Sequence, residues 1–213
     1  YRSLESVTSL IASELSGLSP SEPTIIVENG SINLSKFGTP ILESKNELLK
    51  EKGIKFLADR KLERWIPLFI IGDCPPDSNN DAESEYNQKF FGRIILPFKA
   101  NSGKCFFAQG RTLFNDKPKY FNTSREFGGT IASEILLPYA SHKTVFLTEG
   151  FMDALCLKLC GFNATSLQGA SISQTQARLL KAGGVKHVVV LFDSDIAGHK
   201  GTAKVKRNLL DIG

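Results

Sequence analysis

Three acidic residues in the last third of the sequence could together bind a divalent cation. Glu149 follows the apolar run 145–147, while Asp193 and Asp195 follow the apolar run 188–192. Carboxylates gathered at one place raise one another's pKa unless a cation neutralises them. Oxygen ligands at such density favour Mg²⁺ or Mn²⁺ over zinc. One or two such ions would support phosphoryl or nucleotidyl transfer.

The two apolar runs predict the elements that would bring these acids together. Continuous β-branched runs with helical patterns between them are typical of buried parallel strands. Ligands of an open α/β sheet bind beyond the carboxyl ends of its strands, which is where all three acids fall. Gly150 and Gly198, which follow the acids, would let a phosphate or a second backbone segment approach closely. The alternative is an ordinary α/β domain whose strand-end acids cap helices.

These motifs, Glu149-Gly150 with Asp153 and Asp193-Ser194-Asp195 with Gly198, resemble the TOPRIM signature. TOPRIM domains are shared by bacterial-type (DnaG-like) and phage primases, topoisomerases, and some nucleases and recombination proteins. The resemblance implies a Rossmann-like, mostly parallel sheet. It also implies that Glu149, Asp193 and Asp195 are both the catalytic residues and the ligands of Mg²⁺ or Mn²⁺. Asp153, one helical turn after Glu149, is expected to support the ligands from behind.

A second functional signal is a basic stretch at residues 89–125. Its charged side chains are one acid, Asp116, and eight bases, Lys89, Arg93, Lys99, Lys104, Arg111, Lys117, Lys119 and Arg125. The local charge is therefore +7, in a chain whose net charge is +4. Two predicted strands, 91–98 and 104–111, joined by a turn at 101–103, would spread these cations over one sheet surface. Such a surface suits a nucleic-acid backbone or nucleotide phosphates, whereas the simpler interpretation is a solvated basic face.

The same stretch is similar to the basic subdomain of DnaG-like primases. The matching residues are Phe91, Arg93, Leu96-Pro97, Gly110-Arg111 and the run Pro118-Lys119-Tyr120-Phe121-Asn122. Topoisomerases and TOPRIM nucleases lack this block, so the resemblance favours a primase. It implies contacts to the template or the incoming nucleotide from Arg93, Arg111, Lys119, Tyr120 and Asn122.

The domain organisation expected from these signals is an α/β protein in three parts. Residues 1–40 are an N-terminal extension or linker, residues 41–135 a basic mixed α/β subdomain, and residues 136–213 a TOPRIM domain. The TOPRIM domain is expected to be truncated at its C-terminal end, because the family has a further strand there with another acidic pair. Met152 is the only methionine in the sequence, so we expect an excerpt, a processed product or an excised domain.

Local patterns predict several helix ends. Leu48 and Leu49 give a first helix its apolar face, and Gly53 is expected to close that helix as the residue after its C-cap. Pro67 is expected to end or kink a second helix. Ser173 with Gln176 has the spacing of a capping box at the start of a later helix.

The sequence thus predicts a DNA primase, a nucleotidyltransferase that makes short RNA primers on a single-stranded DNA template from ribonucleoside triphosphates. Two other classes remain open: a TOPRIM nuclease or topoisomerase-type phosphodiesterase, and a non-catalytic nucleic-acid-binding module. A replicative helicase, in cis or in trans, is the expected protein partner. The composition, 41% hydrophobic and 23% charged, is that of a globular protein. No apolar run approaches the ~18 residues of a membrane span. The four cysteines form no CxxC pair, which fits a reducing cytoplasm, and the resemblance implies the cytoplasm of a bacterial or phage-infected cell.

Overall fold

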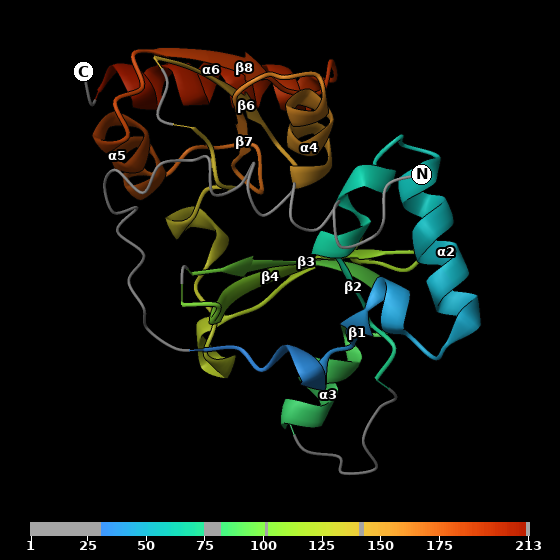
Figure 1. The fold of residues 1–213 in the computed structure, drawn as a ribbon. Coiled ribbons are helices and arrows are strands. Elements are labelled where there is room, and N and C mark those ends of the chain that lie inside the picture. Colours follow the sequence, from blue (N-terminus) through green and yellow to red (C-terminus); the bar gives the residue numbers. More distant parts are fainter. Residues whose placement is uncertain (1–30, 75–81, 101, 141–142, 212–213) are drawn as a thin grey trace. The chain divides into compact units, whose positions relative to one another are not determined.

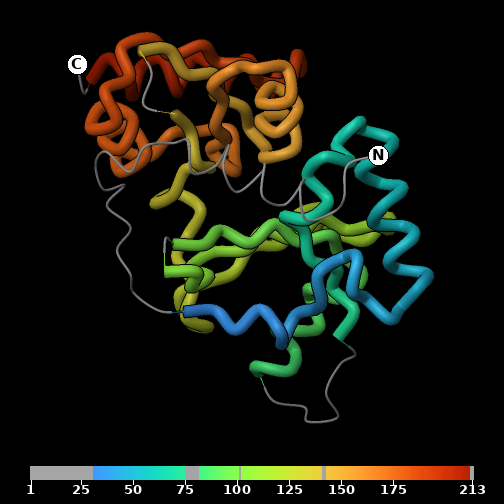
Figure 2. The backbone as a smooth tube through the Cα atoms, viewed as in Figure 1, coloured from blue at the N-terminus to red at the C-terminus, as the bar shows by residue number. Residues whose placement is uncertain are grey.

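The computed structural model describes residues 31–74, 82–100, 102–140 and 143–211 (Figure 1). This part of the chain forms two compact units, which meet in the sequence at Ala132 and Ser133. The backbone of each unit can be followed in Figure 2. Among the described residues, no helix combines the length and the apolar character that a membrane crossing requires.

The first unit is built on an antiparallel sheet with the strand order β1-β2-β3-β4-β5. Its strands are β1 (Thr39–Pro40), β2 (Ile70–Ile71), β3 (Arg93–Lys99), β4 (Cys105–Thr112) and β5 (Tyr120–Asn122). The β3–β4 hairpin confirms the one predicted from the basic stretch, with each strand displaced by one or two residues from its expected bounds. Its register places Arg111 opposite Ile94 and Gln109 opposite Leu96.

Helices and aromatic side chains complete the first unit. Its α-helices are α2 (Glu47–Ala58) and α3 (Ala82–Gln88), and its 3-10 helices are Leu34–Lys36, Ile41–Glu43, Glu63–Leu68 and Arg125–Phe127. The core contains a ring stack of Phe37 on Phe90, with centroids 4.5 Å apart, and another of Tyr86 on Phe127, at 3.9 Å. Ile32 is buried in the same core, so residues from the expected N-terminal extension contribute to this unit.

The structure corrects the expected ends of the first two helices. α2 does not stop at Gly53 but continues through it to Ala58. Gly53 is buried, and a β-carbon there would lie 3.1 Å from Cδ1 of Ile71, so the glycine lets α2 pack closely on the sheet. Leu49 is buried as expected, whereas Leu48 is 63% exposed. Pro67 lies inside the 3-10 helix Glu63–Leu68 rather than at the end of an α-helix.

The second unit contains a parallel three-stranded sheet with the order β7-β6-β8. Its elements are β6 (Thr144–Thr148), α4 (Phe151–Leu159), β7 (Ala164–Ser166), α5 (Gln174–Ala182), β8 (His187–Leu191) and α6 (Ile196–Leu210). A 3-10 helix, Ala132–Glu134, lies where the two units meet in the sequence. The alternation of parallel strands and helices confirms the predicted fold class.

β8 is parallel as predicted but is not buried on both faces. Val188 and Val190 pack against the core that α5 and α6 help to form, together with Val145 and Leu147 of β6. The other face of β8 is open, with Val189 37% exposed and Leu191 44% exposed. β8 is the last strand in the order, so among the described residues it pairs with β6 alone.

The capping box predicted at the start of α5 is present. The Ser173 hydroxyl accepts a hydrogen bond from the Gln176 amide at 3.0 Å, and the Gln176 carboxamide accepts one from the Ser173 amide at 3.0 Å. Gln176 also donates to the carbonyl oxygens of Ile135 and Leu167, at 2.9 and 3.1 Å. This residue therefore ties α5 to the segment before β6 and to the loop after β7.

Candidate functional site

Two adjacent parallel strands place acidic residues at one edge of the second sheet. Glu149 follows β6 and Asp193 follows β8, and the register pairs Thr148 with Leu191 at the carboxyl ends of those strands. The backbone amide of Asp193 donates a hydrogen bond to the Glu149 carboxylate. The structure thus brings together two acidic motifs that are more than forty residues apart in the sequence.

The electrostatics of Glu149 reflect this crowding. Partial burial raises the pKa of the Glu149 carboxyl above its ordinary value, and the negative charge of Asp193 raises it further. Asp195 and Asp153 act in the same direction, whereas the hydrogen bond from the Asp193 amide opposes them. The Glu149 Oε1 atom is buried and has no hydrogen-bond partner. A buried acceptor of this kind is unusual unless something else binds it.

Asp195 has a structural role as well as a place in this cluster. Its Oδ1 atom accepts a hydrogen bond from the Gly198 amide at 2.7 Å, so Asp195 is the N-cap of α6. The alternative in which strand-end acids cap helices therefore describes part of what Asp195 does. Gly198 is buried against the preceding loop, where a β-carbon would lie 2.0 Å from the Asp193 carbonyl oxygen. Glycine is thus needed for α6 to begin this close to Asp193.

Gly150 and Asp153 lie at the start of α4. Gly150 is the N-cap of that helix, and its carbonyl oxygen accepts a hydrogen bond from the Thr148 hydroxyl at 2.8 Å. Asp153 is exposed in the first helical turn, close enough for its charge to affect Glu149. A negative charge in the first turn is also favourable to the helix itself.

The chemistry of these side chains fits a divalent cation. Their donors are carboxylate oxygens, which Mg²⁺ and Mn²⁺ prefer, and the Glu149 Oε1 atom lacks any partner. In their present conformations, no three acidic, histidine or cysteine side chains of the described residues stand close enough to hold one ion. The acids therefore form a negative cluster with a suitable donor set, and not a closed coordination shell.

The first unit carries the predicted basic and aromatic residues on β4 and β5. Arg111 lies opposite Tyr120, and Gln109 lies opposite Asn122. The Arg111 guanidinium lies 5.0 Å from the centre of the Tyr120 ring, and Lys119 Nζ lies 5.9 Å from that centre. The Arg111 Nε and Nη1 atoms are buried without a hydrogen-bond partner. The structure thus holds Arg111 between aromatic rings with unused donors, which suits an anionic ligand.

Arg93 is placed differently from the other predicted basic residues. Its side chain is buried, at 5% exposure, and burial lowers the pKa of its guanidinium. Its Nε atom donates to the Lys89 carbonyl oxygen at 2.6 Å, and Nη1 donates to the Lys119 carbonyl oxygen at 3.3 Å. Arg93 therefore holds the segment before β3 and the start of β5 in place.

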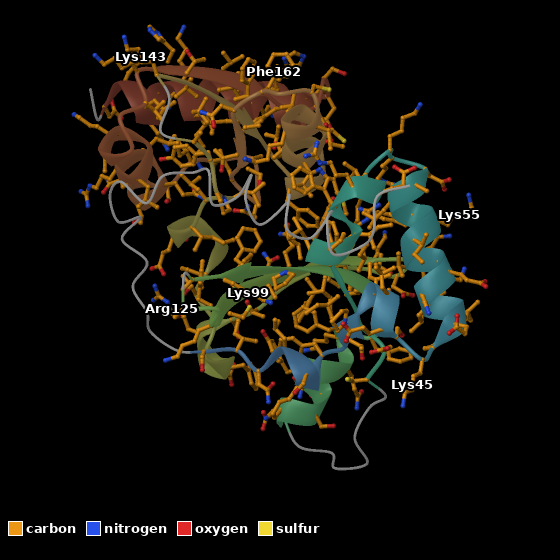
Figure 3. The ribbon with its side chains drawn as sticks, in the orientation of Figure 1. Lys45, Lys55, Lys99, Arg125, Lys143 and Phe162 are labelled. Carbon is orange, nitrogen blue, oxygen red and sulfur yellow. The ribbon has the colours of Figure 1, made fainter. Side chains whose placement is uncertain are left out.

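The basic stretch does not form one continuous surface. Lys99 lies at the opposite end of β3 from Arg93, and Arg125 lies in the 3-10 helix that follows β5; Figure 3 labels both. Lys89 forms an ion pair with Glu85, with 3.6 Å between nitrogen and oxygen. Of the eight bases in residues 89–125, Arg111 and Lys119 are the two that contact the Tyr120 ring.

The structure adds two residues that the sequence analysis missed, Phe56 in the last turn of α2 and Arg60 just after that helix. The Arg60 guanidinium lies 3.7 Å from the centre of the Phe56 ring, and the Arg111 guanidinium lies 5.8 Å from that same centre. Cations and aromatic rings therefore alternate in the order Arg60, Phe56, Arg111, Tyr120 and Lys119. Arg60 lies beyond the end of α2 and is held beside Phe56 by a hydrogen bond from its Nη1 atom to the Phe56 carbonyl oxygen at 3.0 Å.

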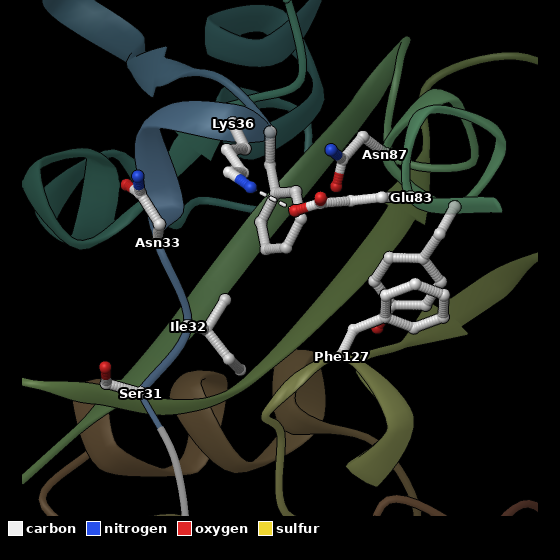
Figure 4. Close-up of a pocket in the computed structure, with 9 residues that line it drawn as sticks. Ser31, Ile32, Asn33, Lys36, Glu83, Asn87 and Phe127 are labelled. Atoms are coloured by element: carbon white, nitrogen blue, oxygen red, sulfur yellow. Dashed lines mark hydrogen bonds and ion pairs between the residues drawn. The ribbon is translucent and has the colours of Figure 1, made fainter. Parts of the chain in front are cut away.

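A small pocket elsewhere in the first unit does not compete with these sites. It has a volume of about 120 Å³ and lies between Ile32 and Phe127, with the Lys36–Glu83 ion pair at its edge (Figure 4). Ligand sites usually occupy about 300–1,000 Å³. The pocket is too small for a nucleotide.

Comparisons with known proteins show what each part of the chain resembles. The Toprim-like family matches residues 146–213, which include all four acids. The DNA primase of Thermotoga maritima is 35% identical over 133 residues, which are 58% of this chain and 23% of that protein. The chain therefore spans less than a quarter of that relative's length.

Solved structures extend the likeness to the whole fold. The DnaG catalytic core superposes with a TM-score of 0.62 at 19% identity, covering 84% of this chain and 66% of that one. This chain matches the DnaG-like primase catalytic core with its TOPRIM fold. A DnaG primase catalytic domain bound to single-stranded DNA superposes with a TM-score of 0.57 at 20% identity, covering 92% of this chain and 66% of that one. The likeness to DnaG-like primase cores thus includes the first unit as well as the TOPRIM unit.

Proposed function

We propose that this chain is the catalytic core of a DNA primase, which makes short RNA primers on single-stranded DNA from ribonucleoside triphosphates. The observation that carries the proposal is the presence, in one chain, of two separate features. One is a TOPRIM unit with acids at the ends of β6 and β8. The other is a unit in which Arg111 has unused donors beside aromatic rings. A TOPRIM nuclease would need only the acids, and a nucleic-acid-binding module would need only the basic and aromatic residues. A primase would need both.

The acidic cluster would carry the chemistry. Glu149, Asp193 and Asp195 would hold Mg²⁺ or Mn²⁺, and Asp153 would support them. When bound, such an ion would neutralise charge at the attacked α-phosphate and activate the primer 3′-hydroxyl. Glu149 is also the candidate to take the proton of that hydroxyl, because it is a carboxylate beside the proposed ion. Gly198 would let α6 start close behind Asp193 and so fix its backbone.

The basic and aromatic residues of the first unit would bind the polynucleotide or the incoming nucleotide. Arg111 and Lys119 would contact phosphates, and Asn122 would add a neutral hydrogen-bond donor. Tyr120 holds the Arg111 guanidinium with its ring, so it would act chiefly by orienting that cation. One structural relative is bound to single-stranded DNA, which supports this assignment. A replicative helicase, in cis or in trans, remains the proposed protein partner.

A direct test is to incubate the chain with ribonucleotides, Mn²⁺ and single-stranded DNA, and to resolve the products on a gel. We expect short RNA products that are absent in Asp193→Ala and retained in Glu51→Ala, an exposed carboxylate on α2. The native-length protein and its Asp193→Ala variant are assayed in parallel, because this chain spans a small part of its relatives' length. Cleaved DNA would instead support a TOPRIM nuclease. Salt-sensitive DNA binding without any product from the native-length protein would support a non-catalytic module.

A further inference from the structure

Gln109 is a buried polar residue next to the proposed nucleic-acid surface. It lies in the middle of β4, opposite Asn122 of β5, and is 3% exposed. Its Nε2 atom donates a hydrogen bond to the Asn122 Oδ1 atom at 2.7 Å. Its Oε1 atom is buried and has no partner in the described part of the chain. Burying an oxygen without a hydrogen-bond partner lowers the stability of the fold. The presence of a glutamine at this position therefore needs an explanation, and its one hydrogen bond, to Asn122, is the place to look.

The backbone around this pair is fixed independently of the two carboxamides. The Ala108 amide donates to the Thr123 hydroxyl at 2.9 Å, and the Thr123 amide donates to the Ala108 carbonyl oxygen at 3.0 Å. The Gln109–Asn122 bond is therefore not needed to pair the strands. What it does fix is the orientation of the Asn122 carboxamide, because an oxygen that accepts from Gln109 leaves the NH₂ group directed away from β4.

Asn122 and Arg111 lie on the same face of the sheet. Residues two apart on a strand share a face, so Gln109 shares one with Arg111, and Tyr120 shares one with Asn122. The register pairs these residues across β4 and β5, which makes Arg111 and Asn122 diagonal neighbours. Diagonal neighbours are roughly 7–8 Å apart at Cβ, within reach of one another's long side chains.

Beside the buried Gln109 oxygen, the groups that this face offers to a ligand are hydrogen-bond donors. Arg111 has two buried donors with no partner, and the Asn122 carboxamide turns its oxygen, not its NH₂ group, toward Gln109. Lys119 adds a further positive charge beside Tyr120. A ligand that matches them is negatively charged and rich in acceptors, which describes a phosphodiester better than the mixed edge of a base.

We propose that Gln109 is a positioning residue that orients the Asn122 carboxamide, so that Asn122 and Arg111 together hold one phosphodiester of a single-stranded nucleic acid. This inference rests on the proposed function, because it assigns the β4–β5 face to the polynucleotide. It adds a residue that contacts no ligand and carries no charge. Its effect on binding would pass entirely through Asn122.

The test is a double-mutant cycle on the affinity of the whole chain for a fluorescent oligothymidylate, measured by anisotropy. Asn122→Ala is expected to weaken binding roughly tenfold, the effect of a hydrogen bond to a charged group. Gln109→Met has a similar volume but cannot donate, and is expected to weaken binding severalfold. The Asn122→Ala/Gln109→Met double variant should bind as Asn122→Ala does, because Gln109 has nothing left to orient.

Two further readouts separate positioning from a structural role. Gln109→Met should unfold at the same or a higher temperature than the parent, since it removes an unsatisfied buried oxygen. It should also leave the salt dependence of binding unchanged, whereas Arg111→Gln should reduce that slope by about 0.7. A merely structural role for Gln109 would lower stability and add to the Asn122→Ala effect.

The outcomes distinguish this inference from the proposed function. Weaker binding in Asn122→Ala with unchanged binding in Gln109→Met would overturn the positioning role and leave the proposed function standing. Additive effects in the double variant would overturn it as well. Unchanged affinity in both Asn122→Ala and Arg111→Gln would remove the β4–β5 face from the polynucleotide site, and both proposals for that face would fall.

Discussion

At the scale of single residues, Gly198 supports the acidic cluster because it has no side chain. Gly198→Ala would bring a β-carbon to 2.0 Å from the Asp193 carbonyl oxygen, and a backbone group cannot move aside cheaply. We expect the free energy of unfolding to fall by about 1–3 kcal/mol, as in other overpacked sites. Urea denaturation of the variant measures this directly.

Gly169→Ala is the matched control for that substitution. Gly169 follows the neighbouring strand β7, and a β-carbon there would meet nothing within 4 Å. Its amide donates to the Glu149 carbonyl oxygen at 3.0 Å, a bond that alanine keeps. We expect its stability to change by less than about 0.5 kcal/mol. Equal stabilities of the two variants would show that the backbone at Asp193 yields easily.

Sequence reasoning identified the acidic residues because their signal is local. Asp193 directly follows its apolar run and Glu149 follows its own run after Thr148, so their placement at strand ends required only that the runs be strands. It did not reveal Phe56 and Arg60, because their relation to Arg111 depends on how α2 packs on the sheet. It could not show that Arg93 is buried and donates to two carbonyl oxygens, because those contacts depend on the fold.

At the scale of elements, Gln176 connects α5 to its surroundings. The residue is fully buried, caps its own helix, and donates to Ile135 and Leu167 in two other segments. Gln176→Ala removes these hydrogen bonds, leaves two buried carbonyl oxygens with one partner fewer and creates a cavity. We expect a loss of about 2–4 kcal/mol in the free energy of unfolding. Thermal and urea unfolding would measure it.

Gln174→Ala supplies the comparison within the same helix. Gln174 is exposed in the first turn of α5, so its truncation should change stability by less than about 0.5 kcal/mol. If Gln176→Ala were equally mild, the capping box would be an incidental contact. The box itself was predictable because both partners lie within four residues of one another.

Other elements were mispredicted where packing overrode the local pattern. Gly53 resembles a helix end in the sequence, but it lies inside α2, where a β-carbon would stand only 3.1 Å from Cδ1 of Ile71. The run at 188–192 reads as buried on both faces, yet Val189 and Leu191 are exposed because β8 is the outer strand of the order β7-β6-β8. The position of a strand within a sheet is a non-local property that the apolar run does not encode.

At the scale of the whole molecule, the basic stretch and the acidic cluster lie in different units. Residues 89–125 carry a local charge of +7 in a chain whose net charge is +4. The basic stretch lies in the first unit, and the four clustered acids lie in the second. Each unit also has its own hydrophobic cluster. A cation and a polyanion should therefore each stabilise a different unit.

Hydrogen exchange of the whole chain, followed by mass spectrometry, tests this division. Mn²⁺ alone should slow exchange in β6, β8 and the start of α6, and single-stranded DNA without metal should slow exchange in β4 and β5. At a ligand concentration ten times its Kd, amides that exchange only from the unbound form should slow by about tenfold. Asp193→Ala should lose the Mn²⁺ effect and keep the DNA effect, because the acids repel the phosphates rather than bind them.

DNA protection confined to the second unit would contradict the assignment of the polynucleotide to the β4–β5 face. Protection of β4 and β5 by Mn²⁺ alone would show that the cation is not bound solely by the acidic cluster.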